Sequence, residues 1–152
     1  MKKIISLLAM FMVIIGLVGC SMDEASSTKP DSKTKDNGKL KVGLSMNTLN
    51  NPFFVAVKEG AEAQAKEDKV ELVITDAQND PGKQISDVEN LLQQNINVLV
   101  IDPTDSDAIV QAVKKANDAD IPVFTIDRSS NGGEVITHIG FDALKSGNIA
   151  GT

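Results

Sequence analysis

The 152-residue sequence contains no tryptophan, no tyrosine, one cysteine and one histidine. A single cysteine cannot form an internal disulfide, and without a cluster of cysteine and histidine no zinc site is predicted. The net charge of −6, with lysines scattered along the chain, argues against nucleic-acid binding. His138 is the one side chain available for histidine catalysis, and we interpret it as structural because it lies within an apolar, strand-like run. The sequence predicts no cofactor.

The remaining composition is typical of one folded domain. Hydrophobic residues make up 41% of the chain and charged residues 24%, which is ordinary for a globular protein. A secreted hydrolase would need a nucleophile with its base or two carboxylates across a cleft, and no Gly-x-Ser-x-Gly elbow occurs. We therefore predict that the protein is not an enzyme.

The first 20 residues have the pattern of a bacterial secretion signal. Lys2 and Lys3 precede an apolar run over residues 4–18, shorter than the roughly 20 residues that span a membrane. The run ends in Leu17-Val18-Gly19-Cys20, which resembles the lipobox of bacterial lipoproteins. The resemblance implies that residues 1–19 are a lipoprotein signal peptide and that Cys20 is the lipid attachment site. The alternative is an uncleaved anchor in which Cys20 is a buried structural thiol.

Residues 20–38 contain mostly serine, threonine, lysine and aspartate, with almost no apolar side chain. Such a segment cannot bury enough surface to order itself, and its opposite charges nearly cancel. We expect a disordered tether that gives a folded domain reach from the lipid surface.

From residue 39 the sequence alternates between strand and helix patterns. Strands are expected at residues 40–46, 70–74, 98–101, 122–126 and 135–139. Asn51-Pro52 and Asp80-Pro81 each combine a good N-cap with a proline at the first helical position. Strands buried on both faces that alternate with amphipathic helices predict an α/β fold with a doubly wound parallel sheet.

The apolar faces of the three expected helices follow from their spacing. The first helix is expected to bury Phe53, Val57, Ala61 and Ala65. The second is expected to bury Ile85, Val88, Leu91 and Leu92. The third is expected to carry Ala108, Ile109, Ala112, Val113 and Ala116.

In such a sheet, ligands bind beyond the carboxyl ends of the strands. The residues expected there are rich in amides, hydroxyls and carboxylates: Asn47, Thr48, Asn50, Asn51, Phe53, Phe54, Asp76, Gln78, Asn79, Asp102, Thr104, Asp105, Asp127 and Arg128. Carboxylates accept from sugar hydroxyls, amides and guanidinium donate to them, and phenyl rings cover sugar C–H faces. Asp127 and Arg128 are expected to hold each other's orientation. Composition alone supports a polar small-molecule site.

Three motifs follow three of the expected strands: Leu49-Asn50-Asn51-Pro52-Phe53-Phe54, Asp102-Pro103-Thr104-Asp105-Ser106-Asp107-Ala108 and Ile126-Asp127-Arg128. In their order and spacing they resemble the ribose-binding proteins of ABC importers. The resemblance extends over essentially all of residues 39–152. It implies that the sugar is contacted by Asn51, Phe53, Phe54, Asp127 and Arg128. The middle motif is expected to be a capped helix start beside the cleft, without ligand contacts.

Each of these residues also has a plainer interpretation. Phe53 and Phe54 lie in the first turn of a helix, where an aromatic side chain commonly belongs to the core. Asn51 could serve as an N-cap, alone or in addition to binding. Asp127 and Arg128 could form a surface ion pair that contributes little to stability.

The resemblance implies a type I periplasmic-binding-protein lobe over residues 39–139 and the start of a second lobe over residues 140–152. It implies capture of a monosaccharide, first of all D-ribose, and delivery to an ABC permease by domain closure. Allose, another sugar or a furanosyl signalling molecule are alternative ligands, and a chemoreceptor is an alternative partner. The full-length protein is expected to be a monomer, lipid-anchored on the extracytoplasmic face of the cell membrane.

The resemblance covers one lobe, so we expect a truncated clamp. Such a clamp leaves half of the ligand hydrated, which predicts weak or no sugar binding by this chain alone. Exposed apolar surface beyond the lobe is expected to favour aggregation or pairing.

Overall fold

The computed structural model describes residues 38–151, which belong to one compact unit. The expected signal peptide, the lipid attachment site at Cys20 and nearly all of the expected tether lie outside the described residues. Within residues 38–151, no helix combines the length and the apolar character that crossing a membrane requires.

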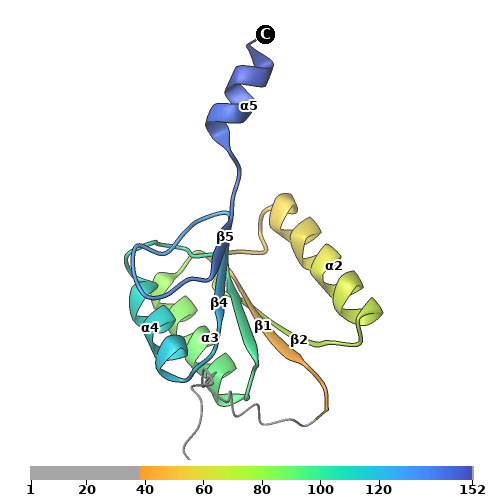
Figure 1. Cartoon of the computed structure of the whole chain (residues 1–152), viewed down its shortest axis with the longest axis vertical. Coiled ribbons are helices and arrows are strands. Elements are labelled where there is room, and N and C mark those ends of the chain that lie inside the picture. The colour runs from red at the N-terminus through yellow and green to blue at the C-terminus, as the bar shows by residue number, and fades with distance from the viewer. Residues whose placement is uncertain (1–37, 152) are drawn as a thin grey trace, which may run out of the picture. The chain divides into compact units, whose positions relative to one another are not determined.

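In the described part of the chain, five parallel strands form one sheet in the order β2-β1-β3-β4-β5 (Figure 1). The strands are β1 (Lys41–Met46), β2 (Glu71–Asp76), β3 (Val98–Ile101), β4 (Val123–Ile126) and β5 (Thr137–Ile139). β1 lies between β2 and β3, so Leu44 pairs with Ile74 on one side and with Val100 on the other. The predicted doubly wound parallel sheet is confirmed, and each strand lies at its expected place.

The helices of the described residues are α2 (Pro52–Glu67), α3 (Pro81–Gln93), α4 (Val110–Asp118) and α5 (Ala143–Ala150). α2 and α3 begin as the sequence predicts, because Asn51 and Asp80 accept hydrogen bonds from backbone N–H groups of the first turn. Proline suits the first helical position since the N–H that it lacks would have no partner there.

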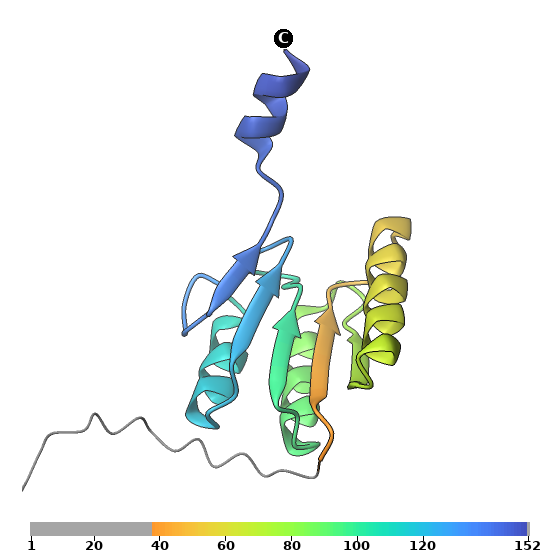
Figure 2. The same ribbon diagram turned by 45° about the vertical axis from the view of Figure 1, so that its right-hand side comes forward.

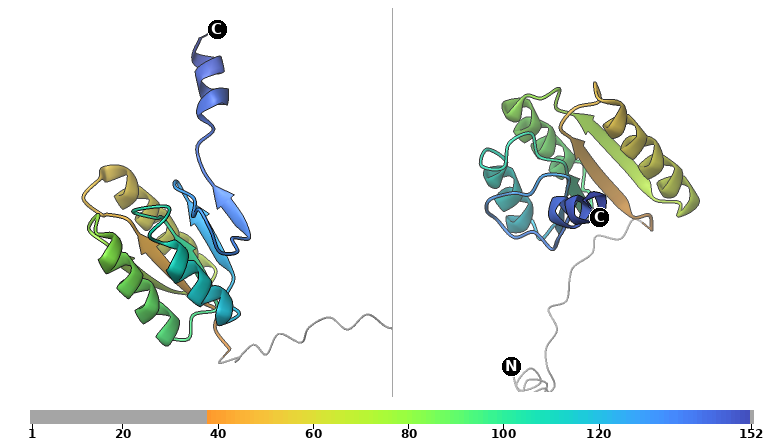
Figure 3. Two further views of the ribbon diagram at one scale, coloured as in Figure 1. Left: turned by 90° about the vertical axis from the view of Figure 1, so that its left-hand side faces the viewer. Right: turned by 90° about the horizontal axis from the view of Figure 1, so that it is seen from above.

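α2 covers one face of the sheet, and α3 and α4 cover the other face (Figure 3). On one face, Phe54 of α2 clusters with Leu44 of β1. On the other face, side chains of α3 and α4 cluster with Leu99 and Ile101 of β3. Successive side chains of a strand point to opposite faces, so Val100 joins the α2 layer and β3 supports both cores.

At Gly43, β1 lies close to the end of α3 and to the loop that follows this helix. A Cβ atom at this position would lie 2.9 Å from Ile96 Cδ1 and 3.2 Å from Leu91 Cδ1. Both distances are shorter than ordinary carbon contacts, so glycine lets β1 and its covering layer pack together.

Two details of the sequence prediction are wrong. The apolar face of α2 begins at Phe54, which is 7% exposed and packs with Val57 and Ala61, whereas Phe53 is 59% exposed. Both phenylalanines fit a helical stripe with Val57 and Ala61, and only the contact with β1 selects one of them. β2 is not buried on both faces, because it is an edge strand and all of its residues are at least partly exposed.

Apolar side chains at the far end of the described chain are exposed, as expected. They are Ile136, Ile139, Phe141, Leu144 and Ile149, and each has more than half of its surface accessible. Ile139 belongs to the edge strand β5, and Leu144 and Ile149 lie on α5.

Candidate ligand-binding site

The order of the strands places a switch point between β1 and β3. From β1 the chain crosses through α2 to β2 on one side, and from β2 it crosses through α3 to β3 on the other side of β1. In open parallel sheets, ligands bind in the crevice beyond the carboxyl ends of two such strands. Figure 2 shows the arrowheads of β1, β3 and β4 at one edge, where the segments that follow these strands begin.

The loop after β1 is held by Asp76 at the end of β2. Asp76 Oδ1 accepts hydrogen bonds from the backbone N–H groups of Leu49, at 3.2 Å, and Gln78, at 2.9 Å. The loop ends at the exposed Asn51, whose Oδ1 caps α2 by accepting from the Phe53 N–H at 2.9 Å. Capping uses the oxygen of the amide, so the NH₂ group of Asn51 keeps its capacity to donate to a ligand.

Phe53 and Phe54 have opposite environments although they are adjacent. Their rings meet edge to face, with centroids 5.2 Å apart and planes inclined by 72°. Phe54 belongs to the core between α2 and the sheet, whereas most of the Phe53 surface is accessible. Phe53 therefore offers an apolar face at this edge, and Phe54 supports it from the core.

Asp127 and Arg128 follow β4 in a tight turn. Asp127 has a φ of 57°, in the left-handed region that residues other than glycine rarely adopt. The turn is closed by the Arg128 N–H, which donates to the Ile126 carbonyl at 2.6 Å, and is tied to β5 by the Asp127 N–H, which donates to Ile139 at 2.9 Å. Unusual backbone conformations of this kind cluster at binding sites, where they redirect side chains.

The expectation that Asp127 and Arg128 hold each other is wrong. No ion pair among the described residues joins them. Arg128 Nη1 instead donates to the Thr104 carbonyl oxygen at 2.7 Å. Because β3 and β4 are neighbours in the sheet, the segment after β3 supplies this carbonyl, and the left-handed turn separates the two adjacent side chains.

Asp102, which follows β3, is fully buried. Neither of its carboxylate oxygens forms a hydrogen bond of good geometry within residues 38–151, although the Asn47 N–H lies near enough to favour the charged form. Burial, and after it the negative charge of Asp127, raise the pKa of Asp102 to about 7, against the opposing effects of the Asn47 N–H and of Arg128. Asp102 thus changes its charge near neutral pH beside the predicted ligand residues.

Buried polar atoms without a partner gather at the carboxyl ends of the strands. Within residues 38–151 they belong to Asn47 after β1, to Thr75 in β2, and to Asp102 and Thr104 after β3. Most buried polar atoms in native proteins are paired, so their concentration marks this edge as a place with spare hydrogen-bonding capacity.

Gln84 of α3, which the sequence analysis did not single out, is also buried at this edge. Its Nε2 donates to the Asp102 carbonyl oxygen at 2.7 Å, and its Oε1 accepts from the Thr104 N–H at 2.7 Å. Gln84 lies four residues before Val88 and seven before Leu91, on the apolar stripe of the helix. A polar residue at a core position was the available signal.

The middle motif begins with a capped turn, as predicted. Asp105 Oδ1 accepts from the N–H groups of Ala108, at 2.8 Å, and Asp107, at 2.9 Å, and these two hydrogen bonds lower the pKa of Asp105. α4 itself begins at Val110, so Ala108 and Ile109 lie in the turn before the helix rather than inside it.

His138 lies on the exposed edge strand β5, and its Nδ1 is 3.0 Å from Oγ1 of the buried Thr125. The two residues are partners in the register of β4 and β5, which agrees with a structural role. Among residues 38–151, no three His, Cys, Asp or Glu side chains are grouped as a metal ion would need.

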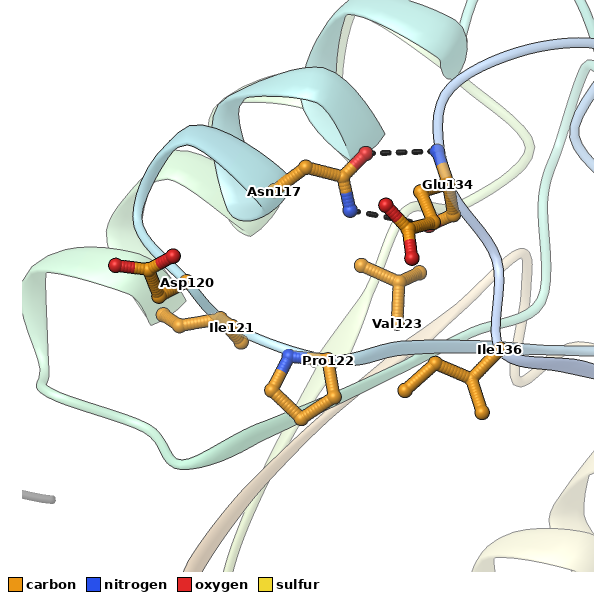
Figure 4. A pocket seen from close by; sticks show the side chains of 7 residues that line it. All are labelled: Asn117, Asp120, Ile121, Pro122, Val123, Glu134 and Ile136. Atoms are coloured by element: carbon orange, nitrogen blue, oxygen red, sulfur yellow. Dashed lines mark hydrogen bonds between the residues drawn. The ribbon is translucent and has the colours of Figure 1, made fainter. Parts of the chain in front are cut away.

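A pocket of about 240 Å³ lies at the other end of the sheet, beside the start of β4 (Figure 4). Asn117 of α4 closes one side of it, with Nδ2 donating to the Glu134 carbonyl at 3.0 Å and Oδ1 accepting from the Glu134 N–H at 2.8 Å. The lining residues are Asn117, Asp120, Ile121, Pro122, Val123, Glu134 and Ile136, none of which was predicted to contact a ligand.

Residues 42–152 match the periplasmic binding protein domain family. The ribose import binding protein RbsB of Bacillus subtilis is 45% identical over 150 residues, which are 99% of this chain and 48% of that protein. RbsB of Escherichia coli is 47% identical over 110 residues, which are 72% of this chain and 37% of that protein. The crystal structure of a Caulobacter myo-inositol binding protein bound to myo-inositol has a TM-score of 0.69 at 33% identity, covering 76% of this chain and 39% of that one. This chain spans about half the length of the first relative and less of the other two.

Proposed function

Because this chain belongs to the periplasmic binding protein domain family, we propose that its residues 39–139 form the sugar-binding lobe of an extracytoplasmic solute-binding protein. The ligand is a monosaccharide, first of all D-ribose, and an ABC permease receives it. The observation that supports the proposal is that a capping amide and an exposed phenyl ring follow β1, and an anchored guanidinium follows β4, at the same edge of the parallel sheet. The two relatives named as ribose import binding proteins support the choice of sugar.

In this proposal each group at the site has a separate task. Asn51 donates to a sugar hydroxyl while its oxygen caps α2, and Phe53 covers a C–H face with Phe54 beneath it. Asp127 accepts from one sugar hydroxyl, and Arg128, anchored by Thr104, donates to the adjacent hydroxyl. An acceptor and a donor side by side suit the adjacent hydroxyls of a sugar.

The proposed contacts predict weak binding by this lobe. Asn51, Phe53, Asp127 and Arg128 are all exposed, so a sugar seated on them keeps much of its hydration. We expect a dissociation constant of about 1 mM, which corresponds to roughly 4 kcal/mol. Tight capture then requires a second lobe that closes over the sugar.

The test is a titration of the isotope-labelled chain with D-ribose, followed by NMR. We expect saturable shifts at Asn51, Phe53 and Arg128 and none at the Asn117 pocket. Arg128→Ala should abolish the response, whereas Lys115→Ala, which removes an exposed cation paired with Glu89 on the helical face, should leave it unchanged. The absence of a saturable response, or shifts confined to the pocket, would contradict the proposal.

A second ligand class has one observation in its favour. The Caulobacter structure with a TM-score of 0.69 holds myo-inositol, a cyclic polyol without an anomeric carbon. Parallel titrations with D-ribose, D-allose and myo-inositol distinguish the classes. A preference of about tenfold for myo-inositol, or about 1.4 kcal/mol, would move the assignment from a sugar to a cyclic polyol.

We further propose that the protein is a lipoprotein anchored through Cys20 after removal of residues 1–19, a proposal that the lipobox sequence supports. Mass spectrometry of the protein from a membrane fraction should find acyl chains on an N-terminal Cys20. Cys20→Ser should release the protein from that fraction. Recovery of membrane-bound protein that retains residues 1–19 would exclude cleavage.

A further inference from the structure

We propose that Gln84 is a positioning residue of the ligand site, whose buried amide holds the backbone on both sides of Pro103 and thereby fixes the guanidinium of Arg128. Because this role rests on the proposed function, in which Arg128 contacts the ligand, it extends the site into α3. Gln84 itself has only 1% of its surface exposed and does not touch the ligand.

The amide of Gln84 meets two backbone groups that have no other hydrogen-bond partner among residues 38–151. β3 ends at Ile101, and Pro103 has no N–H, so the strand ladder cannot continue through this segment. The Asp102 carbonyl accepts from Gln84 Nε2 and the Thr104 N–H donates to Gln84 Oε1, both at 2.7 Å. One planar side chain thus spans the proline and fixes the orientation of both flanking peptides.

The same amide also reaches strand β1. Gln84 Nε2 lies 3.4 Å from Oγ of Ser45, which is fully buried in β1. β1 and β3 are the strands on either side of the switch point, so Gln84 links them from the covering helix α3. All hydrogen-bonding atoms of the amide are used, as a buried glutamine requires.

Thr104 transmits this arrangement to Arg128. Its N–H is held by Gln84, and its carbonyl accepts from Arg128 Nη1 at 2.7 Å. This is the hydrogen bond that orients the exposed guanidinium, which has no ion-pair partner among the described residues. The N–H and the carbonyl of Thr104 belong to successive peptide groups joined at its Cα, so a displacement of the first also moves the carbonyl. Arg128 then loses its anchor although no atom of its own side chain has changed.

The chain contains a matched control for this geometry. Asn117 makes the same pair of hydrogen bonds with one backbone residue, Glu134, but at the amino end of β4. Both side chains are amides that tie a loop to a helix, and only Gln84 is connected to Arg128. A loss that reflects general destabilisation should therefore appear with either substitution.

Arg128 is the only arginine of the sequence, so arginine labelled with ¹³C and ¹⁵N gives one side-chain spectrum without assignment. The experiment compares the full chain with Gln84→Met, which keeps the length and removes the amide, and with Asn117→Leu. Rotation of the Arg128 guanidinium is measured by NMR exchange, and D-ribose is then titrated into each protein.

Gln84→Met should speed guanidinium rotation by about fivefold, the effect of losing one hydrogen bond, and weaken D-ribose binding by a similar factor. Asn117→Leu should lower the melting temperature and leave both readouts unchanged. Unchanged rotation in folded Gln84→Met, or equal changes in both variants, would overturn the role of Gln84. If Gln84→Met does not fold, Gln84→Glu decides, because it keeps the acceptor for Thr104 and loses the donor to Asp102.

The two failures can be told apart. If the unsubstituted chain shows no response to D-ribose, the proposed function fails. The rotation of Arg128 is measured without sugar, and it still shows whether Gln84 positions this side chain.

Discussion

The two ends of the same sheet differ in whether their polar groups have hydrogen-bond partners among the described residues. At the amino end, Asn97 Oδ1 accepts from the Lys41 N–H at 2.8 Å, and Asn117 forms two hydrogen bonds with Glu134. At the carboxyl end, Asn47, Thr75, Asp102 and Thr104 each have at least one buried side-chain oxygen without a hydrogen-bond partner among the described residues. Within residues 38–151, the buried side-chain atoms without a partner thus lie at the end where the proposed function places the ligand.

The left-handed residues divide in the same way. Near the amino end, three of them directly follow the capping residues of α2, α3 and α4, where helices commonly terminate in this conformation: Lys69, Asn95 and Asp120. At the carboxyl end, the left-handed residues follow strands β2 and β4 instead: Gln78, Asn79 and Asp127. The first group ends helices, and the second turns the chain at the proposed site.

The largest expected effect is a difference in stability between substitutions of two adjacent residues, Phe54 in the core and Phe53 at the proposed site. Phe54→Ala should lower the free energy of unfolding by about 3 kcal/mol, because it opens a cavity between α2 and β1. Phe53→Ala removes an exposed ring and should change stability by less than about 0.5 kcal/mol. Urea denaturation measures both. D-ribose titration of Phe53→Ala should show weaker binding, and equal losses of stability in the two variants would contradict this division.

A smaller effect tests the unpaired carboxyl group. The pKa of Asp102 is raised from 3.8 to about 7, so the folded protein keeps this proton where the unfolded chain has lost it. Its contribution to stability is complete below about pH 4 and is lost as the pH rises toward 7. Asp102→Asn should match the parent at low pH and exceed it by roughly 2 kcal/mol above neutrality, about half of what the shift allows, because the new amide also needs partners.

Asp105, at the same end of the sheet, should change stability with pH in the direction opposite to Asp102. Its pKa is lowered by the N–H groups of Ala108 and Asp107, so its contribution is present above its ordinary pKa and is lost as the pH falls. Asp105→Asn should therefore remove the part of the decrease in the free energy of unfolding that the parent shows as the pH falls below the ordinary pKa of this carboxyl. Parallel profiles for the parent and Asp102→Asn would show that Asp102 is not perturbed.

The smallest expected effect is the gain in stability when glycine replaces a left-handed residue, Lys69 at one end of the sheet or Asp127 at the other. Glycine adopts this conformation without strain, so Lys69→Gly should stabilise the protein by up to about 1 kcal/mol and leave D-ribose binding unchanged. Asp127→Gly should have a similar effect on thermal stability but lose the carboxylate that accepts from the sugar. Loss of binding in Lys69→Gly would remove the distinction between the two ends.

Much of the fold is readable from local signals. The Asn-Pro and Asp-Pro pairs predict where α2 and α3 begin, and the run from Val98 to Ile101 is a strand with the predicted bounds. These signals are local because an N-cap bonds within its own turn and a buried strand needs a continuous apolar run. The choice between Phe53 and Phe54 was not readable, since both fit the helical period and only β1 decides which ring is covered.

The sequence by itself determined the order of strands and helices, the starts of two helices and the polar character of the segments after the strands. The tertiary structure alone decided how those polar groups are arranged: that Thr104 rather than Asp127 anchors Arg128, that Asp102 is buried without a well-formed hydrogen bond among the described residues, and that Gln84 spans Pro103. The reason is physical. Caps and periodicity act over a few residues, whereas these contacts join residues 18 to 24 positions apart, which only the crossovers of the sheet bring together.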